Sequence, residues 1–257
     1  MATILKLEGL TKNFSGLVAV NHLDLEMRPR TIHSMIGPNG SGKSTTINMI
    51  NGSFPPTEGK VFFQDQEITK KKTFEIGRLG IGRTYQNLKL FSSMSVFENL
   101  MAGRSYFAKQ GFVNFLFNQK LAQQEERQIR EKAEYVLNYV GLYDHRNDIA
   151  GSLPYGNQKL VELGRALMID PALLLLDEPA AGLNPTERTM FIDTLLRVFD
   201  DGVDLFLIEH NMDVVMNISH TVTVINFGAK IAEGTPAEVQ SHPEVIRAYL
   251  GERYRKR

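Results

Sequence analysis

The sequence has 257 residues in which 29 Lys plus Arg balance 29 Asp plus Glu, so its formal net charge is zero. This balance argues against nucleic acid as the main partner, because a surface that tracks phosphates usually carries an excess of Lys and Arg. The absence of cysteine excludes disulfides, cysteine zinc sites, thiolate nucleophiles and iron–sulfur clusters, while 42% hydrophobic residues suffice for one large domain, with or without a sub-domain.

The N-terminal segment lacks the pattern of a secretory signal. Lys6, Glu8 and Lys12 interrupt the stretch that would have to be apolar, so export by that route is not expected. No run elsewhere approaches the ~18 apolar residues of a spanning helix. We therefore expect any connection to a membrane to go through a partner protein.

The first part of the chain predicts two strands, then a strand, a loop and a helix. Apolar and polar residues alternate over 4–8 and over 23–27, which is typical of half-buried antiparallel strands, and Ser15-Gly16 between them favours a turn. From Thr31, the segment TIHSMIG predicts a strand. A glycine-rich loop follows, and the segment STTINMINGS after it has helical spacing.

The middle of the chain predicts a mostly helical insertion. Residues 95–103 and 121–140 have helical spacing, and the second segment places its apolar residues opposite its charges, namely Ile129, Ala133, Val136, Leu137 and Val140. Five aromatic residues lie between the two segments: Tyr106, Phe107, Phe112, Phe115 and Phe117. This cluster is either a satellite core, a docking surface or a contact with lipid.

The last part of the chain returns to alternating strands and helices. A helix is expected over about 157–169, and the unbroken leucine run at 173–176 predicts a parallel strand buried on both faces. Asn184 before Pro185 predicts a helix start, because Asn caps well and proline fits the first helical position. The segments DLFLIEH and TVTVINFGAKIAEG predict a buried strand and a terminal hairpin.

The segment from Gly37 to Thr45 matches the phosphate-binding pattern G-x-x-x-x-G-K-[ST], between a predicted strand and a predicted helix. Its glycines let backbone N–H groups converge on phosphate oxygens, and the helix N-terminus adds a positive dipole end. A chance match occurs in about one of a hundred chains of this length. We therefore prefer a P-loop nucleotide site to a glycine turn that only caps a helix.

Four side chains suit phosphoryl transfer at this P-loop. Lys43 would place its charge against the β and γ phosphates, and the Ser44 hydroxyl would ligate Mg²⁺. Asp177, at the end of the leucine strand, would be the second carboxylate on the metal side. Glu178 would act as general base for the attacking water. The alternative for this carboxylate pair is a surface loop that caps a strand.

These motifs and four others resemble, in order and spacing, the ATPases of ATP-binding cassette (ABC) transporters. The others are Gln86 in RTYQN, LPYGNQ at 153–158, AAGLNP at 180–185 and His210 in LIEHNM. Within that superfamily, the segments YGNQ, DEPAAGLNP, IEHNMDVVM and EVIRAYLGE resemble the ATPase subunits of branched-chain amino acid importers, a family that includes urea and amide importers.

The resemblance implies an α/β P-loop ABC ATPase fold with an N-terminal antiparallel β sub-domain and a helical sub-domain. Residues 1–87 and 151–235 would form the nucleotide-binding core of the single 1–257 domain. Residues 88–150 would form the helical sub-domain, and residues 236–257 a C-terminal helix and a basic tail.

The resemblance also implies residue roles. The catalytic residues would be Lys43, Gln86, Glu178 and His210, and the metal-side residues Ser44, Gln86 and Asp177. Phe14 would stack on the adenine of the nucleotide. The P-loop would contact the phosphates through Gly37, Pro38, Asn39, Gly40, Ser41, Gly42, Lys43, Ser44 and Thr45. Leu153, Gly156 and Asn157 would face the nucleotide of a partner subunit. Alternatively, Phe14 is a core residue, Gln86 a solvated residue at a strand end, and His210 a helix cap.

The signature segment departs from the family pattern Leu-Ser-Gly-Gly-Gln. Pro154 offers a phosphate neither a hydroxyl nor an N–H group, and Tyr155 replaces a glycine. Asn184 stands where the family usually carries Asp. The hypothesis is a heterodimer in which this chain's P-loop faces an intact signature of a different ATPase. A homodimer is the alternative, since Tyr-Gly signatures resemble the subfamily norm.

The implied function is Mg²⁺-dependent ATP hydrolysis that powers an importer of branched-chain or other hydrophobic amino acids or amides. The partners would be transmembrane permease subunits, a second ATPase subunit and, indirectly, a substrate-binding protein, at the cytoplasmic face of the inner or plasma membrane. The alternatives are an exporter or lipid-moving ATPase and, less expected, a non-transport cassette. A P-loop kinase would leave LPYGNQ and His210 unexplained.

Overall fold

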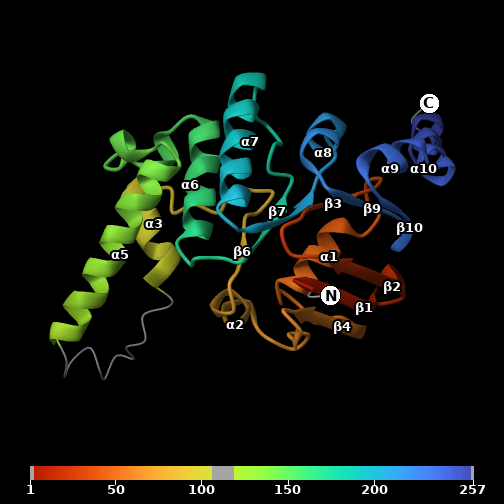
Figure 1. The fold of residues 1–257 in the computed structure, drawn as a ribbon, viewed down its shortest axis with the longest axis horizontal. Coiled ribbons are helices and arrows are strands. Elements are labelled where there is room, and N and C mark those ends of the chain that lie inside the picture. Colours follow the sequence, from red (N-terminus) through yellow and green to blue (C-terminus); the bar gives the residue numbers. More distant parts are fainter. Residues whose placement is uncertain (1–2, 106–118, 256–257) are drawn as a thin grey trace.

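The computed structural model describes residues 3–105 and 119–255, so the aromatic cluster at 106–117 lies outside the described residues. Helices α3, α5 and α6 lie at one end of the molecule, and the antiparallel sheet lies toward the other end (Figure 1). A second, mainly parallel sheet runs between them and carries the candidate site at one of its edges.

The N-terminal sheet is antiparallel, with the strand order β2-β1-β4-β5. Strands β1 (Leu5–Phe14) and β2 (Leu17–Met27) form a hairpin, which confirms the two predicted strands. Ser15 and Gly16 turn the chain with φ of 46° and 99°, as a two-residue hairpin turn requires. Strands β4 (Glu58–Phe63) and β5 (Gln66–Glu67) complete the sheet and were not predicted.

The core sheet has the strand order β10-β9-β3-β8-β7-β6. Its parallel strands are β3 (Ile32–Ile36), β6 (Ile81–Arg83), β7 (Leu173–Asp177), β8 (Asp204–Ile208) and β9 (Thr221–Asn226). Strand β10 (Ala229–Gly234) pairs with β9 antiparallel, as expected for the terminal hairpin. Only β6 among these strands was missed by the sequence analysis.

Strand β7 is buried on both faces, as its unbroken leucine run predicted. Leu174 and Leu176 belong to the core that includes α6 and α7, whereas Leu173 and Leu175 belong to the core shared with α1 and the antiparallel sheet. All four side chains are fully buried, at 0% exposure. The strand therefore joins the two largest cores of the molecule.

The helices cover both sheets. They are α1 (Lys43–Ile50), α2 (Thr73–Arg78), α3 (Val96–Ser105), α5 (Gln119–Tyr139), α6 (Tyr155–Leu167), α7 (Pro185–Asp200), α8 (Met212–Ile218), α9 (Pro236–Ser241) and α10 (Pro243–Arg255), with short turns at Tyr143–His145 and Ala150–Ser152. Helix α6 begins at Tyr155, two residues before its predicted start. Helix α7 begins after Asn184, whose side chain accepts a hydrogen bond from the Glu187 N–H at 2.9 Å. The capping prediction is confirmed.

The topology brings four chain segments to one edge of the core sheet. The carboxyl ends of parallel strands meet at one edge, where α/β proteins bind their ligands. The chain leaves β3 into the P-loop, β6 toward Gln86, β7 into Glu178 and β8 toward His210. Segments far apart in the sequence therefore converge.

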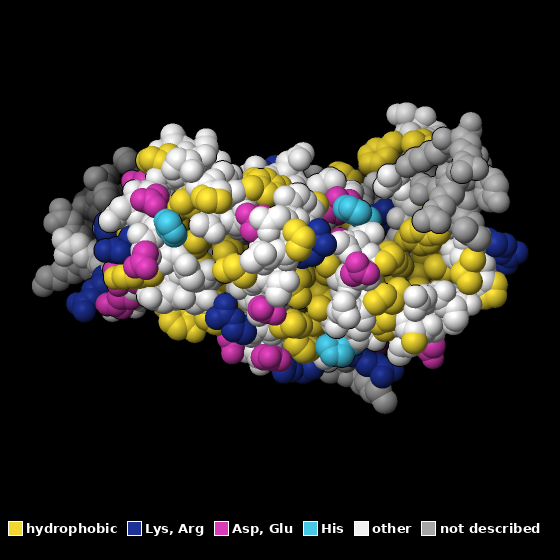
Figure 2. All heavy atoms as spheres, turned by 90° about the horizontal axis from the view of Figure 1, so that it is seen from above, with side chains coloured by type: hydrophobic (Ala, Val, Ile, Leu, Met, Phe, Trp, Pro, Cys, Tyr) yellow, Lys and Arg dark blue, Asp and Glu magenta, His cyan; other side chains and the backbone are white. Residues whose placement is uncertain are grey.

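In the described part of the chain, no helix combines the length and the apolar character needed to cross a bilayer. Lys and Arg side chains are interspersed with Asp and Glu over the face shown in Figure 2. That face presents no large field of one sign.

Candidate active site

The P-loop is wrapped so closely on its neighbours that two of its positions admit only glycine. Gly37 has φ 155°, and a Cβ there would lie 2.0 Å from the Ile225 carbonyl oxygen. Gly42 has φ 105°, and a Cβ would lie 2.4 Å from the Ala19 carbonyl oxygen. These contacts fix the loop against β9 and β2 and leave its backbone shaped for an anion.

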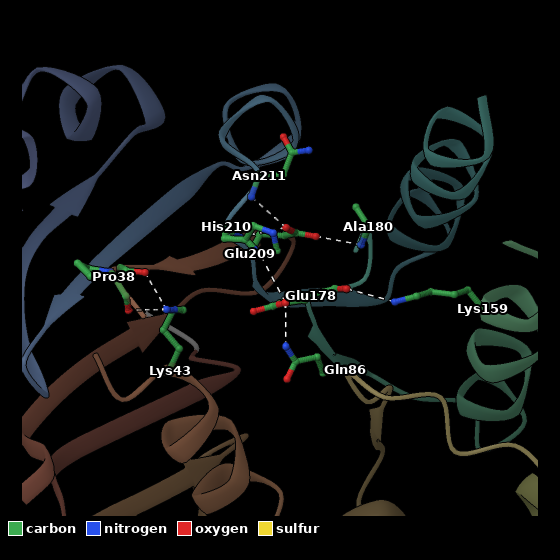
Figure 3. Close-up of polar contacts among 10 residues, drawn as sticks. Pro38, Lys43, Gln86, Lys159, Glu178, Ala180, Glu209, His210 and Asn211 are labelled. Atoms are coloured by element: carbon green, nitrogen blue, oxygen red, sulfur yellow. Dashed lines mark hydrogen bonds and ion pairs between the residues drawn. The ribbon is translucent and has the colours of Figure 1, made fainter. Parts of the chain in front are cut away.

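Lys43 points into the P-loop and is buried. Its Nζ donates to the carbonyl oxygens of Gly37 and Pro38, at 2.7 Å and 2.9 Å (Figure 3). The loop therefore holds a cation at the place where phosphate oxygens are expected. Ser44 is exposed at the start of α1, and Thr45 is half-buried beside it.

The other P-loop residues form the outer turn. Ser41 is buried, and its backbone N–H donates to the Pro38 carbonyl at 3.2 Å. Its own carbonyl accepts from the Gly228 N–H at 3.0 Å, which ties the loop to the β9–β10 turn. Asn39 and Gly40 are exposed, and Gly40 has φ 76°.

Glu178 is the point at which three predicted residues meet (Figure 3). Its Oε2 accepts from Gln86 Nε2 at 3.0 Å and lies 3.4 Å from His210 Nδ1. Its backbone N–H donates to the Ile208 carbonyl at 2.8 Å, and its φ of 48° is unusual for a residue other than glycine. The structure therefore brings Gln86, Glu178 and His210 together.

Asp177 is a buried carboxylate with one open oxygen. Its Oδ2 lies 3.6 Å from Arg83 Nη2, and its Oδ1 has no hydrogen-bond partner in the part of the chain that the structure describes. Burial raises the pKa of Asp177, and the nearby positive charge of Arg83 opposes that rise. Among the described residues no group of three His, Asp or Glu side chains gathers to bind a metal. A cation here would therefore need further ligands from a hydroxyl, a phosphate or water, as Mg²⁺ accepts.

Two charged residues that the sequence analysis missed support the site. Glu209 is buried; its Oε1 accepts from the Ala180 N–H at 3.0 Å, and its Oε2 from the N–H groups of His210 and Asn211 at 3.1 Å and 3.2 Å. Lys159 on α6 is also buried, and its Nζ donates to the Glu178 carbonyl at 3.2 Å. A charged residue directly before His210 was the only signal available for Glu209.

Phe14 lies at the end of β1 and is 42% exposed, so the alternative that it is a core residue does not fit. Its ring meets Phe54 edge-on at a centroid distance of 5.6 Å, and Lys12 Nζ lies 5.2 Å from its centre. His210 does not cap a helix, because Asn211 is the N-cap of α8. Gln86 is exposed, but its amide is held by Glu178.

The signature segment does not join the P-loop of its own chain. Helix α6 lies with α3 and α5, whereas α1 lies beside the antiparallel sheet (Figure 1). Pro154 is the N-cap of α6, and a Cβ on Gly156 would lie 2.9 Å from Glu187 Cδ. The Tyr155 ring is 41% exposed. Leu153 is buried and Asn157 half-buried, so Pro154 and Tyr155 form the outer surface of this turn.

Comparison with known families gives two matches. A family described as "ABC transporter" matches residues 20–181. A family described as "Branched-chain amino acid ATP-binding cassette transporter" matches residues 229–255. The second match covers β10 and the C-terminal helices, outside the segments that carry the candidate active site.

Individual relatives match over nearly the whole chain. The high-affinity branched-chain amino acid transport ATP-binding protein BraF of Pseudomonas aeruginosa is 41% identical over 97% of this chain and 98% of its own. The corresponding protein LivG of Escherichia coli is 39% identical, with the same coverage. A crystal structure of the ADP conformation of an ATP-binding cassette of an ABC transporter has a TM-score of 0.85 at 35% identity, covering 98% of this chain and 99% of that one.

Proposed function

The chain belongs to the ATP-binding cassette transporter ATPases, in their branched-chain amino acid family, and from this premise we propose that it powers an importer of branched-chain amino acids. ATP hydrolysis coupled to transport follows from the family. The substrate class is supported by the match at 229–255 and by the printed function of the relatives. The observation that carries the catalytic assignment is the convergence of Gln86 and His210 on the Glu178 carboxylate.

We propose that the P-loop binds the ATP phosphates. Backbone N–H groups at the start of α1 would donate to phosphate oxygens, helped by the positive end of the helix dipole. Lys43 would exchange the carbonyls of Gly37 and Pro38 for oxygens of the β and γ phosphates. Phe14 would stack on adenine, which its exposed ring supports.

In the chemical step, Glu178 would accept the proton of the water that attacks the γ-phosphorus, while ADP leaves. Gln86 and His210 share Glu178 Oε2 in this structure and would turn to the water and the γ-phosphate oxygens when ATP binds. Glu209 would hold His210 by its backbone, and Lys159 would hold the Glu178 carbonyl. In this proposal the side chains of Gln86 and His210 move, while the backbone contacts made by Glu209 and Lys159 stay in place.

The residues present fit a magnesium ion. The open, buried Asp177 Oδ1 is an unsatisfied acceptor that a cation would satisfy, and Ser44 and Gln86 offer further oxygen ligands. Bound there with ATP, Mg²⁺ would neutralise charge on the β and γ phosphate oxygens.

The proposed organisation places nucleotide binding in 1–87 and 151–235 and contact with the permease in the helical sub-domain at 88–150. The C-terminal part at 236–257, expected as one helix and a basic tail, contains the two helices α9 and α10. Two ATPase subunits would enclose two nucleotides, with Leu153, Gly156 and Asn157 facing the partner's ATP. The complex would sit at the cytoplasmic face of the membrane, held by permease subunits that receive cargo from a substrate-binding protein.

We favour a heterodimer, because Pro154 and Tyr155 form the surface that would meet the partner's phosphates. The test compares Glu178→Gln with Pro154→Ala in the reconstituted transporter, with phosphate release as the readout. Glu178→Gln is expected to lower turnover by about 10²–10⁴-fold, since it removes the general base. Pro154→Ala is expected to leave turnover within about twofold, because in the asymmetric dimer this signature segment would complete the weaker of the two sites. Equal losses in the two variants would rule out the asymmetric dimer. Unchanged turnover in Glu178→Gln would contradict the catalytic assignment.

A further inference from the structure

The first turn of α6 packs against the loop that carries Glu178. Residues 178–184 connect β7 to α7, and we call them the base loop because they begin with the proposed general base. A Cβ on Gly182 would lie 2.8 Å from Tyr155 Cε1 and 3.4 Å from Cζ, so the tyrosine ring lies directly on this glycine. One helical turn further on, Lys159 Nζ donates to the Glu178 carbonyl at 3.2 Å (Figure 3). Residues four apart share one face of a helix, so one face of α6 contacts the base loop twice.

The base loop has an uncommon backbone conformation that needs support from its surroundings. Glu178 has φ 48° and Gly182 has φ 78°, both in the left-handed region. A residue with a Cβ stays in that region only where neighbouring groups fix it. The first half of the loop is fixed through the Ala180 N–H, which donates to Glu209 Oε1 at 3.0 Å. The second half is exposed at Gly182, and there it meets the Tyr155 ring.

Tyr155 is the first residue of α6, after the N-cap Pro154, at a position where the family pattern has glycine. A glycine would leave empty the space that the ring fills beside Gly182. The ring is 41% exposed, so more than half of its surface is covered. Lys159 Nζ lies 5.7 Å from the ring centre, within the range of cation–π attraction. Burial raises the pKa of Tyr155, and the charge of Glu162 adds to this rise, so the ring stays neutral.

A neighbouring contact fixes the far end of the base loop. A Cβ on Gly156 would lie 2.9 Å from Glu187 Cδ, so the start of α6 touches the first turn of α7. Glu187 Oε2 in turn accepts from the N–H of Asn184, the last residue of the base loop, at 3.0 Å. The first turn of α6 therefore contacts the base loop or its anchor at Tyr155, Gly156 and Lys159.

We propose that Tyr155 is a positioning residue for the general base of its own chain. Its ring presses on Gly182 and thereby holds the base loop, with Glu178, in the geometry that hydrolysis needs. The proposal rests on the proposed function, because it needs Glu178 to act as the base. Tyr155 thus serves the site at its own P-loop, although the signature segment around it would face the nucleotide of a partner. Misplacing a reacting group by about 1 Å can cost about 100-fold in rate, so a residue that does not touch ATP can still control turnover.

Amide hydrogen exchange of the isolated full-length chain tests the contact itself. Within the base loop, the Ala181 N–H donates to the Glu178 carbonyl at 3.1 Å. Tyr155→Ala should speed exchange of this amide by about tenfold or more, because the loop opens more often without the ring. Tyr155→Phe keeps the ring and should exchange as wild type does. Tyr135→Ala is the matched control, since it removes a 59% exposed tyrosine on α5, and it should leave the base loop unchanged. Wild-type exchange in a folded Tyr155→Ala chain would refute the contact.

Steady-state ATP hydrolysis by the reconstituted transporter tests the consequence for catalysis. Tyr155→Ala should lower kcat by about 10–100-fold and leave KM for ATP within about threefold, since the P-loop is untouched. Tyr155→Phe should restore turnover to within about twofold of wild type, whereas Tyr155→Gly, which introduces the family residue, should be as slow as Tyr155→Ala. Tyr155→Phe as slow as Tyr155→Ala would assign the effect to a hydroxyl contact with the partner's nucleotide and overturn the proposal. Tyr155→Gly as fast as wild type would overturn it as well.

A double-mutant cycle with Gly182→Ala measures whether the two residues act through one contact. In wild type the added Cβ would collide with the Tyr155 ring, so Gly182→Ala should lower kcat by about tenfold or more. In the Tyr155→Ala chain the ring is absent, and the same substitution should cost less than about threefold. Losses that multiply independently would refute a shared contact. Unchanged turnover in Glu178→Gln would instead contradict the proposed function, while hydrogen exchange would still decide whether Tyr155 holds the loop.

Discussion

Acidification from pH 8 to pH 5 should destabilise the fold through one buried histidine. His33 lies in β3 and is 1% exposed. Burial lowers its pKa from 6.5 to about 4. The charge of Glu233 opposes this lowering, and the charge of Lys230 adds to it. Its Nε2 lies 2.8 Å from Thr223 Oγ1, and that hydroxyl donates to Glu233 Oε2 at 2.9 Å. Nε2 therefore carries the proton, and Nδ1, which has no partner in the described structure, would have to accept a second one.

The magnitude follows from the two pKa values. Because the folded pKa lies below the unfolded one, the imidazole does not oppose folding above pH 6.5, and stability falls as the pH drops from 6.5 toward about 4. Only the unfolded chain takes up the proton in that window. The slope approaches 1.4 kcal/mol per pH unit, which gives a loss of about 2 kcal/mol at pH 5 and about 3 kcal/mol below pH 4.

Urea denaturation of wild type and His33→Gln at pH 8 and pH 5 measures this loss. The chain contains no tryptophan, so circular dichroism follows unfolding. Gln keeps a donor for Thr223 but does not titrate, so the variant should lose about 2 kcal/mol less than wild type on acidification. His145→Gln, at an exposed histidine, should show the wild-type loss. Parallel losses in wild type and His33→Gln would refute the assignment.

Three further substitutions test the packing. Gly37→Ala should raise the dissociation constant for ATP at least tenfold, because its Cβ would lie 2.0 Å from the Ile225 carbonyl; wild-type affinity in a nucleotide-binding titration would contradict that contact. Asn184→Ala should lower the unfolding free energy, measured by urea denaturation, by about 1 kcal/mol. Asn184→Asp keeps the capping oxygen, so its unfolding free energy should equal that of wild type. Leu174→Ala should lower the unfolding free energy by about 2–5 kcal/mol, whereas Leu17→Ala, at a 69% exposed position, should stay within about 0.5 kcal/mol.

The elements predicted from the sequence are those whose pattern repeats over several residues. The leucine run of β7 and the capped start of α7 have local signals that no tertiary contact overrides. Strand β6 has three residues, too few for a period, and α2 has Lys72 as its N-cap and a glycine inside. Such short elements exist because their neighbours support them, so the sequence alone does not define them.

The residues of the candidate site also divide into those that the sequence predicts and those that only the structure reveals. The residues at 37–45, Asp177 and Glu178 belong to contiguous motifs, so the sequence located them. Lys159 and Glu162 look like an ordinary charged pair on a helix, which is normally exposed. They are buried because the Glu178 carbonyl and the backbone at Tyr85 meet α6 in three dimensions. An acidic residue between the apolar residues Val161 and Leu163 was the one available signal for Glu162.

The left-handed backbone conformation of Glu178 lowers the stability of the fold, although its carboxylate is the proposed general base. At φ 48° a residue with a Cβ is strained, whereas glycine is not. After the entropy that glycine adds to the unfolded chain is subtracted, Glu178→Gly would stabilise the fold by up to about 1 kcal/mol while removing the proposed base. Selection for stability alone would therefore favour glycine at this position, and the proposed role of Glu178 as general base opposes that preference. A subunit relieved of hydrolysis in an asymmetric transporter would be free to lose this carboxylate.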